Sequence, residues 1–438
     1  MDQRGKYYNE HAKVTNLEKI TSSDNNANIL RMLRGDDEPG WDGVLSIGRN
    51  RSINYPHGNY YAMRGGSNLD WWRQVADDLG WLGYFIGRSY TLHQLCITDF
   101  PGEPEGIDAF IEGINRNRSI QVLDIESDFG GVVYDKMTPF FRNNSSLSHL
   151  TLRGVNITIE SASSIAMILR QINDLHHLAL EESNLGEEEL TEILTALSTR
   201  PLLEELHLRD NNIDRVGCAT LGALLGSKTL NVKSLSLPNN EIDDEGLQML
   251  VAGMTNNTII EQLSLCGNES ISTRGLRSLT PLLQSERCSL TDLYFYRMNI
   301  GDEGFAVLAR GLSKNTLLQR LWFDLSTCGI TSAGWQSFAT LLCDTSSVNN
   351  TYLSNHTLEL IGKSCDVGSP TDQVHDHVRD LLRMRKIANS KEVAMRKIFQ
   401  SHPDLDMEPF FEWGLKFLPW RLAGLRELNQ TGCYVAEC

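Results

Sequence analysis

Residues 203–208 read LEELHL, an L-x-x-L-x-L pattern whose apolar positions are also filled elsewhere by isoleucine, valine or phenylalanine. Ten copies of the pattern occur, the last of them in degraded form, and they start at residues 92, 120, 147, 175, 203, 232, 260, 290, 318 and 348. Consecutive starts are 27 to 30 residues apart. So regular a period indicates a repeat architecture, rather than the roughly two or three domains that the length alone would suggest.

Each of the later copies is followed by a segment with helical spacing. Apolar residues stand four and eight positions after a glycine, as in Leu221 and Leu225 after Gly217. This spacing places them on one face of a helix. A short strand and an amphipathic helix cannot bury their apolar sides alone, so neighbouring copies must stack. The sequence therefore predicts a curved α/β solenoid of about ten repeats over residues 92–367.

The repeats resemble the leucine-rich repeat family, in its long ribonuclease-inhibitor-like subclass, over about residues 92–358. The family's turn asparagine, eight residues after the first leucine, appears here as Asn211, Asn240 and Asn268. The end of the chain is similar to that of uncharacterised algal leucine-rich repeat proteins. The resemblance implies a parallel β-sheet on the concave face and helices on the convex face.

A solenoid exposes apolar surface at both ends and needs caps. Apolar residues at helical spacing predict an N-terminal helical cap over residues 69–91. The polar segment before it, residues 1–68, is predicted to be weakly ordered, with one short helix near residues 29–33. Residues 368–438 are predicted to form a helical, aromatic-rich C-terminal cap.

Composition excludes several classes of function. The 56 acidic and 40 basic residues give a net charge of −16, which disfavours binding to nucleic acid or to an anionic membrane. The nine cysteines show no CxxC spacing, and we expect a monomer with reduced thiols in the cytoplasm, with the nucleus as the alternative location. Common nucleophile-elbow, phosphate-loop, dinucleotide and zinc-protease motifs are absent from the sequence, so we expect neither catalysis nor a cofactor.

In each copy of the pattern, the side chains of the second, fourth and sixth residues after the first leucine are predicted to point to the concave face. On the last three copies these positions collect aromatic and charged residues, which are the types that dominate binding hot spots. The predicted partner-binding residues are Asp292, Tyr294, Tyr296, Arg320, Trp322, Asp324 and Tyr352. An alternative is that the C-terminal cap folds back over these rings.

A second group on the same face is rich in histidine. His149, His177 and Glu205 occupy the second position on three adjacent strands, and His207 is nearby. Such residues can bind zinc, but solvated surface residues are the interpretation that we favour, so no metal is predicted.

These patterns favour a non-catalytic scaffold that binds another protein on its concave face. The resemblance also allows a regulator of a small GTPase, such as an activator, or a sensor or inhibitor of the ribonuclease-inhibitor-like type. The sequence does not identify the partner.

Overall fold

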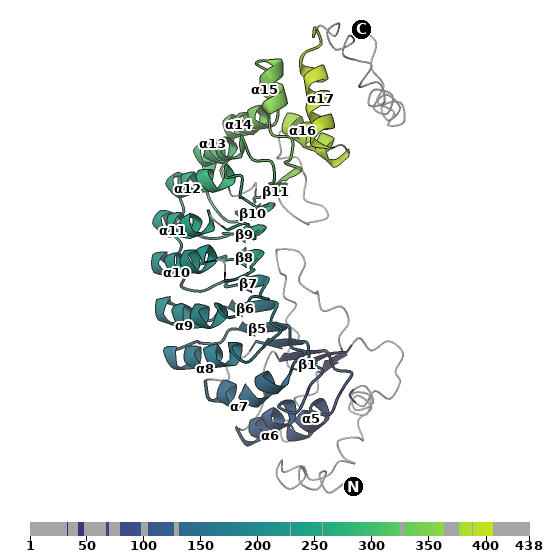
Figure 1. Ribbon diagram of the computed structural model, residues 1–438, viewed down its shortest axis with the longest axis vertical. Helices are drawn as coiled ribbons and strands as arrows, with labels where there is room; N and C mark the ends of the chain where they lie inside the picture. Colours follow the sequence, from purple (N-terminus) through teal and green to yellow (C-terminus); the bar gives the residue numbers. More distant parts are fainter. Residues whose placement is uncertain are drawn as a thin grey trace.

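A computed structural model describes Leu33 and residues 43–47, 67–69, 79–97, 104–126, 131–227, 229–255, 257–324, 328–362, 376–387 and 389–405. The strands form one open, 12-stranded sheet in the order β12-β11-β10-β9-β8-β7-β6-β5-β4-β3-β1-β2. Every paired neighbour is parallel. Figure 1 shows the strands along the inner side of an arc and the repeat helices along its outer side. The predicted leucine-rich repeat solenoid is therefore confirmed.

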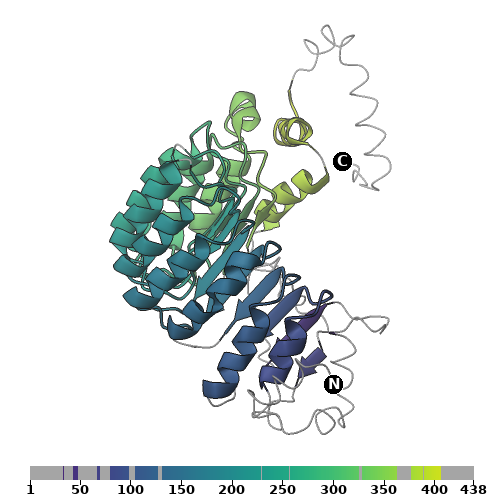
Figure 2. The same cartoon turned by 60° about the horizontal axis from the view of Figure 1, so that its bottom comes forward.

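The elements follow the repeat period. The strands are β1 (Val44–Ile47), β2 (Ser67–Leu69), β3 (Gln94–Ile97), β4 (Val122–Ile125), β5 (His149–Arg153), β6 (His177–Glu181), β7 (Glu205–His207), β8 (Ser234–Ser236), β9 (Gln262–Ser264), β10 (Asp292–Tyr294), β11 (Arg320–Trp322) and β12 (Leu360–Ile361). The helices are α5 (Leu79–Ile86), α6 (Pro104–Ile114), α7 (Gly131–Asn143), α8 (Ile159–Leu169), α9 (Glu187–Leu197), α10 (Arg215–Gly226), α11 (Asp244–Met254), α12 (Thr273–Leu283), α13 (Gly301–Leu312), α14 (Ser332–Leu342), α15 (Val348–Leu353), α16 (Asp376–Ile387) and α17 (Ser390–Ser401). Figure 2 shows the row of repeat helices from another side.

The register places equivalent residues of successive repeats opposite one another. Leu178 pairs with Leu206, and both side chains are fully buried beneath the sheet. Side chains alternate between the faces of a strand, so the residues beside these leucines point to the concave face. His149, His177 and Glu205 form one such row, as predicted.

The tenth repeat does not lie where its degraded pattern placed it. Residues Val348–Leu353 form helix α15, and Ser347 caps its first turn. The last strand is instead Leu360–Ile361, which pairs with β11 through Arg320 and Leu360. Its repeat therefore begins at Leu358, 40 residues after the ninth start at Leu318. The prediction of Tyr352 on the concave sheet was wrong, because that residue lies on α15.

A row of buried asparagines explains where the strands begin. These residues stand three positions before the first apolar residue of their repeats, and each side-chain oxygen accepts a hydrogen bond from the backbone two residues later. Each amide nitrogen donates to a backbone carbonyl of an earlier repeat. The row consists of Asn117, Asn144, Asn257, Asn315 and Asn355. Asn355 fixes the start of the last repeat at Leu358, and the N-x-x-L spacing was a signal that sequence analysis missed.

The turn asparagines carried by the family resemblance have the expected role. Asn211, Asn240 and Asn268 are buried, and each donates to a backbone carbonyl of the preceding repeat at 2.8 to 2.9 Å. The two rows of asparagine satisfy turn backbone groups that would otherwise be buried without partners.

The N-terminal end differs from expectation. Within the segment expected to be weakly ordered, β1 pairs with β3 so that Leu45 lies opposite Leu95, and β2 pairs with β1. Leu45 and Ile47 are buried like the motif residues of a repeat. Leu33 is helical and buried, whereas the rest of the expected short helix near residues 29–33 lies outside the described part. Helix α5 lies within the predicted cap, and residues 70–78 of that cap fall outside the described part.

At the other end, α16 packs on α14 and α17 packs on α15. The Nζ of Lys397 in α17 donates to the carbonyls of Leu342 and Asn355 at 2.5 and 3.2 Å. This buried ammonium ties the cap to the last repeats. The aromatic part of the predicted cap, after residue 405, lies outside the described residues. Among the described helices, none is long and apolar enough to cross a membrane.

Candidate functional site

The concave face carries two groups of side chains at equivalent repeat positions. We call His149, His177, Glu205 and His207, on β5 to β7, the histidine cluster. We call Asp292, Tyr294, Arg320 and Trp322, on β10 and β11, the aromatic patch. Both come from the second and fourth positions of their repeats, so the same backbone geometry presents both.

The aromatic patch is built around one buried carboxylate. The side chain of Asp292 is 1% exposed and forms a two-pronged ion pair with Arg320 across the strands. Its oxygens also accept hydrogen bonds from Trp322 Nε1 at 3.2 Å and from the Thr291 hydroxyl at 2.8 Å. A buried charge persists only when it is paired and hydrogen-bonded, and these contacts meet that requirement.

The same carboxylate orients the two rings. Tyr294 and Trp322 stack with centroids 5.8 Å apart and planes 7° from parallel, and both are half-buried. Burial, together with the neighbouring Asp292 charge, raises the pKa of Tyr294 to about 12. The phenol therefore stays protonated near neutral pH, and the patch offers two adjacent aromatic side chains and the half-exposed Arg320.

The other predicted patch residues are placed differently. Tyr296 is 8% exposed, so its ring is not the solvent-directed ring that the sequence predicted. Asp324 is half-buried, two residues after β11. Tyr352 is 56% exposed but lies on α15. The structure thus brings together Asp292, Tyr294, Arg320 and Trp322 through hydrogen bonds and ring stacking, and leaves Tyr352 off the strands.

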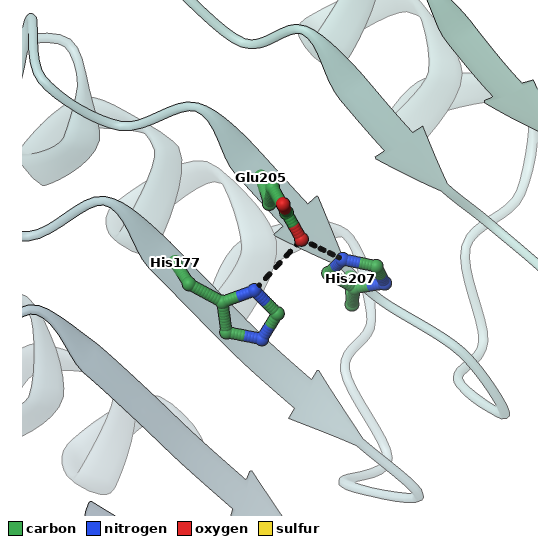
Figure 3. A group of neighbouring side chains, drawn as sticks. All are labelled: His177, Glu205 and His207. Carbon is green, nitrogen blue, oxygen red and sulfur yellow. Dashed lines mark hydrogen bonds and ion pairs between the residues drawn. The ribbon is translucent and has the colours of Figure 1, made fainter. Parts of the chain in front are cut away.

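The histidine cluster has the opposite construction, with the carboxylate exposed and the rings buried. Glu205 Oε2 lies 3.1 Å from His177 Nδ1 and 3.4 Å from His207 Nε2 (Figure 3). The two histidine side chains are 8% exposed, whereas that of Glu205 is 50% exposed. His149 stacks on His177 with ring centroids 5.5 Å apart.

Burial favours the neutral form of the His207 and His149 imidazoles. It lowers the pKa of His207 to about 3, so this ring is neutral near neutral pH. Burial and the neighbouring His177 also lower the pKa of His149. The hydrogen bond with His177 lowers the pKa of Glu205, which holds its carboxylate ionised. The cluster thus combines an ionised carboxylate with the neutral imidazole of His207.

Sequence analysis named His149, His177 and Glu205 as the metal candidates, with His207 only nearby. In the structure His207 contacts Glu205 together with His177, and His149 stacks on His177. His207 is two residues from Glu205 on the same strand, and side chains two apart share a face. The interpretation as solvated surface residues was wrong for His177 and His207, because both rings are buried.

The chain is similar to known leucine-rich repeat proteins. Residues 201–222 and 230–251 match the Leucine Rich repeat family. The chain is 27% identical to the ribonuclease inhibitor of Mus musculus over 61% of its own length and 65% of the relative. It is 30% identical to NACHT, LRR and PYD domains-containing protein 5 of Homo sapiens over 43% of the chain and 15% of that protein.

A third relative is Protein CARMIL of Dictyostelium discoideum, 24% identical over 61% of the chain and 26% of that protein. The chain therefore spans less than two thirds of each of these relatives.

Proposed function

The chain is a leucine-rich repeat protein of the ribonuclease-inhibitor-like kind, and from this premise we propose that it is a non-catalytic scaffold that binds a partner protein on its concave face. The aromatic patch is the anchor of this interaction. The relatives support protein binding in general, whereas the choice of the patch rests on the chain's own geometry.

The buried carboxylate of Asp292 is the observation that carries the proposal. It holds Arg320 and the indole N–H of Trp322 in place before any partner arrives. Side chains that are already ordered lose little conformational entropy on binding, and tryptophan, tyrosine and arginine are the commonest hot-spot residues. The patch therefore has the composition and the rigidity of an anchor.

The chemistry of the patch favours a partner that presents apolar and basic groups. Asp292 neutralises Arg320, so the positive charge of the guanidinium is already matched. The faces of Tyr294 and Trp322 attract cations as well as apolar groups. The net charge of −16 adds a long-range attraction for a basic protein.

Affinity capture followed by quantitative mass spectrometry tests the proposal. The wild-type chain is compared with a variant that carries Tyr294→Ala and Trp322→Ala. The matched control carries Ser234→Ala and Ser236→Ala, at the same two positions of the strand β8. We expect at least one protein to be retained by the wild type and the control and lost by the aromatic variant.

A purified partner should bind the aromatic variant roughly 30-fold more weakly or worse, which corresponds to about 2 kcal/mol. The melting temperature should change by only a few degrees, because both rings are half-exposed. If the aromatic variant captures the same proteins with equal affinity, the patch is not the anchor. A large fall in melting temperature would instead indicate that the rings pack against the chain's own cap.

A further inference from the structure

The histidine cluster lies on other strands than the aromatic patch and has no role in the function proposed above. We propose that His177, Glu205 and His207 bind one Zn²⁺ ion, with a fourth coordination position left for water. The three residues come from two adjacent strands, β6 and β7, and each directs one ligand atom toward the others (Figure 3).

The distances between the ligand atoms are close to those of a zinc site. Zinc bonds to histidine nitrogen and carboxylate oxygen are about 2.0–2.2 Å, so the ligand atoms of a tetrahedral site lie roughly 3.3 Å apart. Glu205 Oε2 is 3.1 Å from His177 Nδ1 and 3.4 Å from His207 Nε2. All three ligand atoms lie within 4.8 Å of one another. Zinc binding would therefore need the two histidine nitrogens to approach each other by at most about 1.5 Å, and small side-chain rotations are enough for this movement.

The sheet holds the ligands in this arrangement without a metal. The register pairs His177 with Glu205 and Ala179 with His207, which fixes the backbone positions of all three. The rings of His177 and His207 are in contact with centroids 4.8 Å apart, and His149 stacks on the other side of His177. Packed neighbours restrict the rotations of these side chains, so little ordering remains for binding to impose.

The donor set selects the class of metal. Imidazole nitrogens suit zinc and its transition-metal neighbours, whereas Ca²⁺ and Mg²⁺ prefer sites made of oxygen ligands. Histidine coordinates a metal through its neutral imidazole, so two coordinated imidazoles and one carboxylate would carry a net charge of −1, which partly offsets the charge of a divalent cation. Two histidines and one glutamate are also a known set of protein ligands for zinc with an open position.

Calorimetric titration of ZnCl₂ into the metal-free, full-length chain tests the site. We expect one site in the wild type and at least tenfold weaker binding in Glu205→Gln, whose side chain keeps its shape but loses the charge. Because Glu205 is half-exposed, this variant should fold. His207→Gln should weaken zinc binding by a similar factor, with circular dichroism used to verify its fold.

His176→Gln is the matched control. His176 is the immediate neighbour of His177, but its ring pairs with Asp174 instead, with Nε2 3.4 Å from a carboxylate oxygen. We expect zinc binding by this variant to equal that of the wild type. Equal isotherms for the wild type and Glu205→Gln, or no zinc binding by the wild type, would overturn the proposal.

Cobalt(II) provides an independent readout of the ligands. The visible spectrum of the Co²⁺-loaded chain should be that of a four-coordinate ion with nitrogen and oxygen ligands, and it should weaken in Glu205→Gln. A strong thiolate charge-transfer band that persists in Glu205→Gln would place the metal on cysteines and overturn the proposal. The Tyr294→Ala and Trp322→Ala variant should bind zinc normally, so the site and the proposed function can fail separately.

Discussion

The histidine cluster and the aromatic patch occupy equivalent positions of the same sheet, yet each is the inverse of the other. In the patch the carboxylate of Asp292 is buried, and Tyr294, Arg320 and Trp322 are half-exposed around it. In the cluster the carboxylate of Glu205 is half-exposed, and the neighbouring imidazoles are buried. A buried acid fixes large groups that face outward, which suits a protein partner. An exposed carboxylate beside buried imidazoles suits a small cation.

The largest expected effect concerns the buried acid. Asp292→Ala removes the partner of Arg320 and leaves the hydrogen-bond donors of Thr291 and Trp322 without their acceptor. We expect a loss of about 2–3 kcal/mol in the free energy of unfolding, toward the lower end of the range for broken buried ion pairs because Arg320 is partly exposed. Chemical denaturation measures this loss.

Asp292→Asn is the control for that measurement, since it keeps an acceptor oxygen and should cost less. A change below about 0.5 kcal/mol in Asp292→Ala, the usual range for surface substitutions, would show that the carboxylate does not hold the patch together.

The second prediction concerns the stability of the folded chain at low pH. His207 has a pKa of about 3 in the folded chain against 6.5 for an unperturbed histidine. Between these values the unfolded chain binds more protons than the folded chain, so the free energy of unfolding must fall as the pH is lowered. Between pH 6.5 and pH 5 the contribution of His207 to this fall should be about 1.5 kcal/mol, which is smaller than the effect of Asp292→Ala. Chemical denaturation at a series of pH values, without metal, measures it.

His207→Gln should lose this part of the pH dependence, while His176→Gln should keep it. Other carboxylates contribute to the acid response of all three chains, so the difference between the variants is the quantity to compare. A His207→Gln variant with the wild-type slope would show that the buried ring is not the source.

The smallest effect is expected for the exposed acid. When a chelator keeps the chain free of metal, Glu205→Gln should change the free energy of unfolding by less than about 1 kcal/mol. A half-exposed ion pair contributes little to stability. Chemical denaturation in parallel with Asp292→Ala gives the comparison directly. If Glu205→Gln cost as much as Asp292→Ala, the two groups would not be inverse, and the carboxylate of Glu205 would be structural.

The period of the sequence predicted most of the sheet, because a motif leucine can be buried only in the stacked register. Nine of the ten starts were right, and the tenth failed at Val348, where the apolar pattern was too weak to distinguish a strand from a helix. The buried Asn355 marks the true position of that repeat. Tyr352 was misplaced for the same reason.

The candidate residues were predicted less well than the fold. Alternation along a strand tells which side chains share a face, and it brought His177, Glu205, Asp292 and Trp322 to the concave side. Which of them touch depends on side-chain rotation and on neighbours in other strands. The contact of His207 with Glu205 and the burial of Tyr296 are of this kind.

By itself the sequence determined the repeat period, the register and the face on which each strand residue lies, since these follow from the burial of regularly spaced apolar side chains. Tertiary structure alone decided which carboxylate is buried. Burial of Asp292 requires donors that strand β11 and Thr291 place around it, and these contacts leave no periodic trace in the chain. The start of the last strand is marked in the sequence by the N-x-x-L spacing of Asn355, whose hydrogen bonds to carbonyls about 40 residues away fix it in the fold.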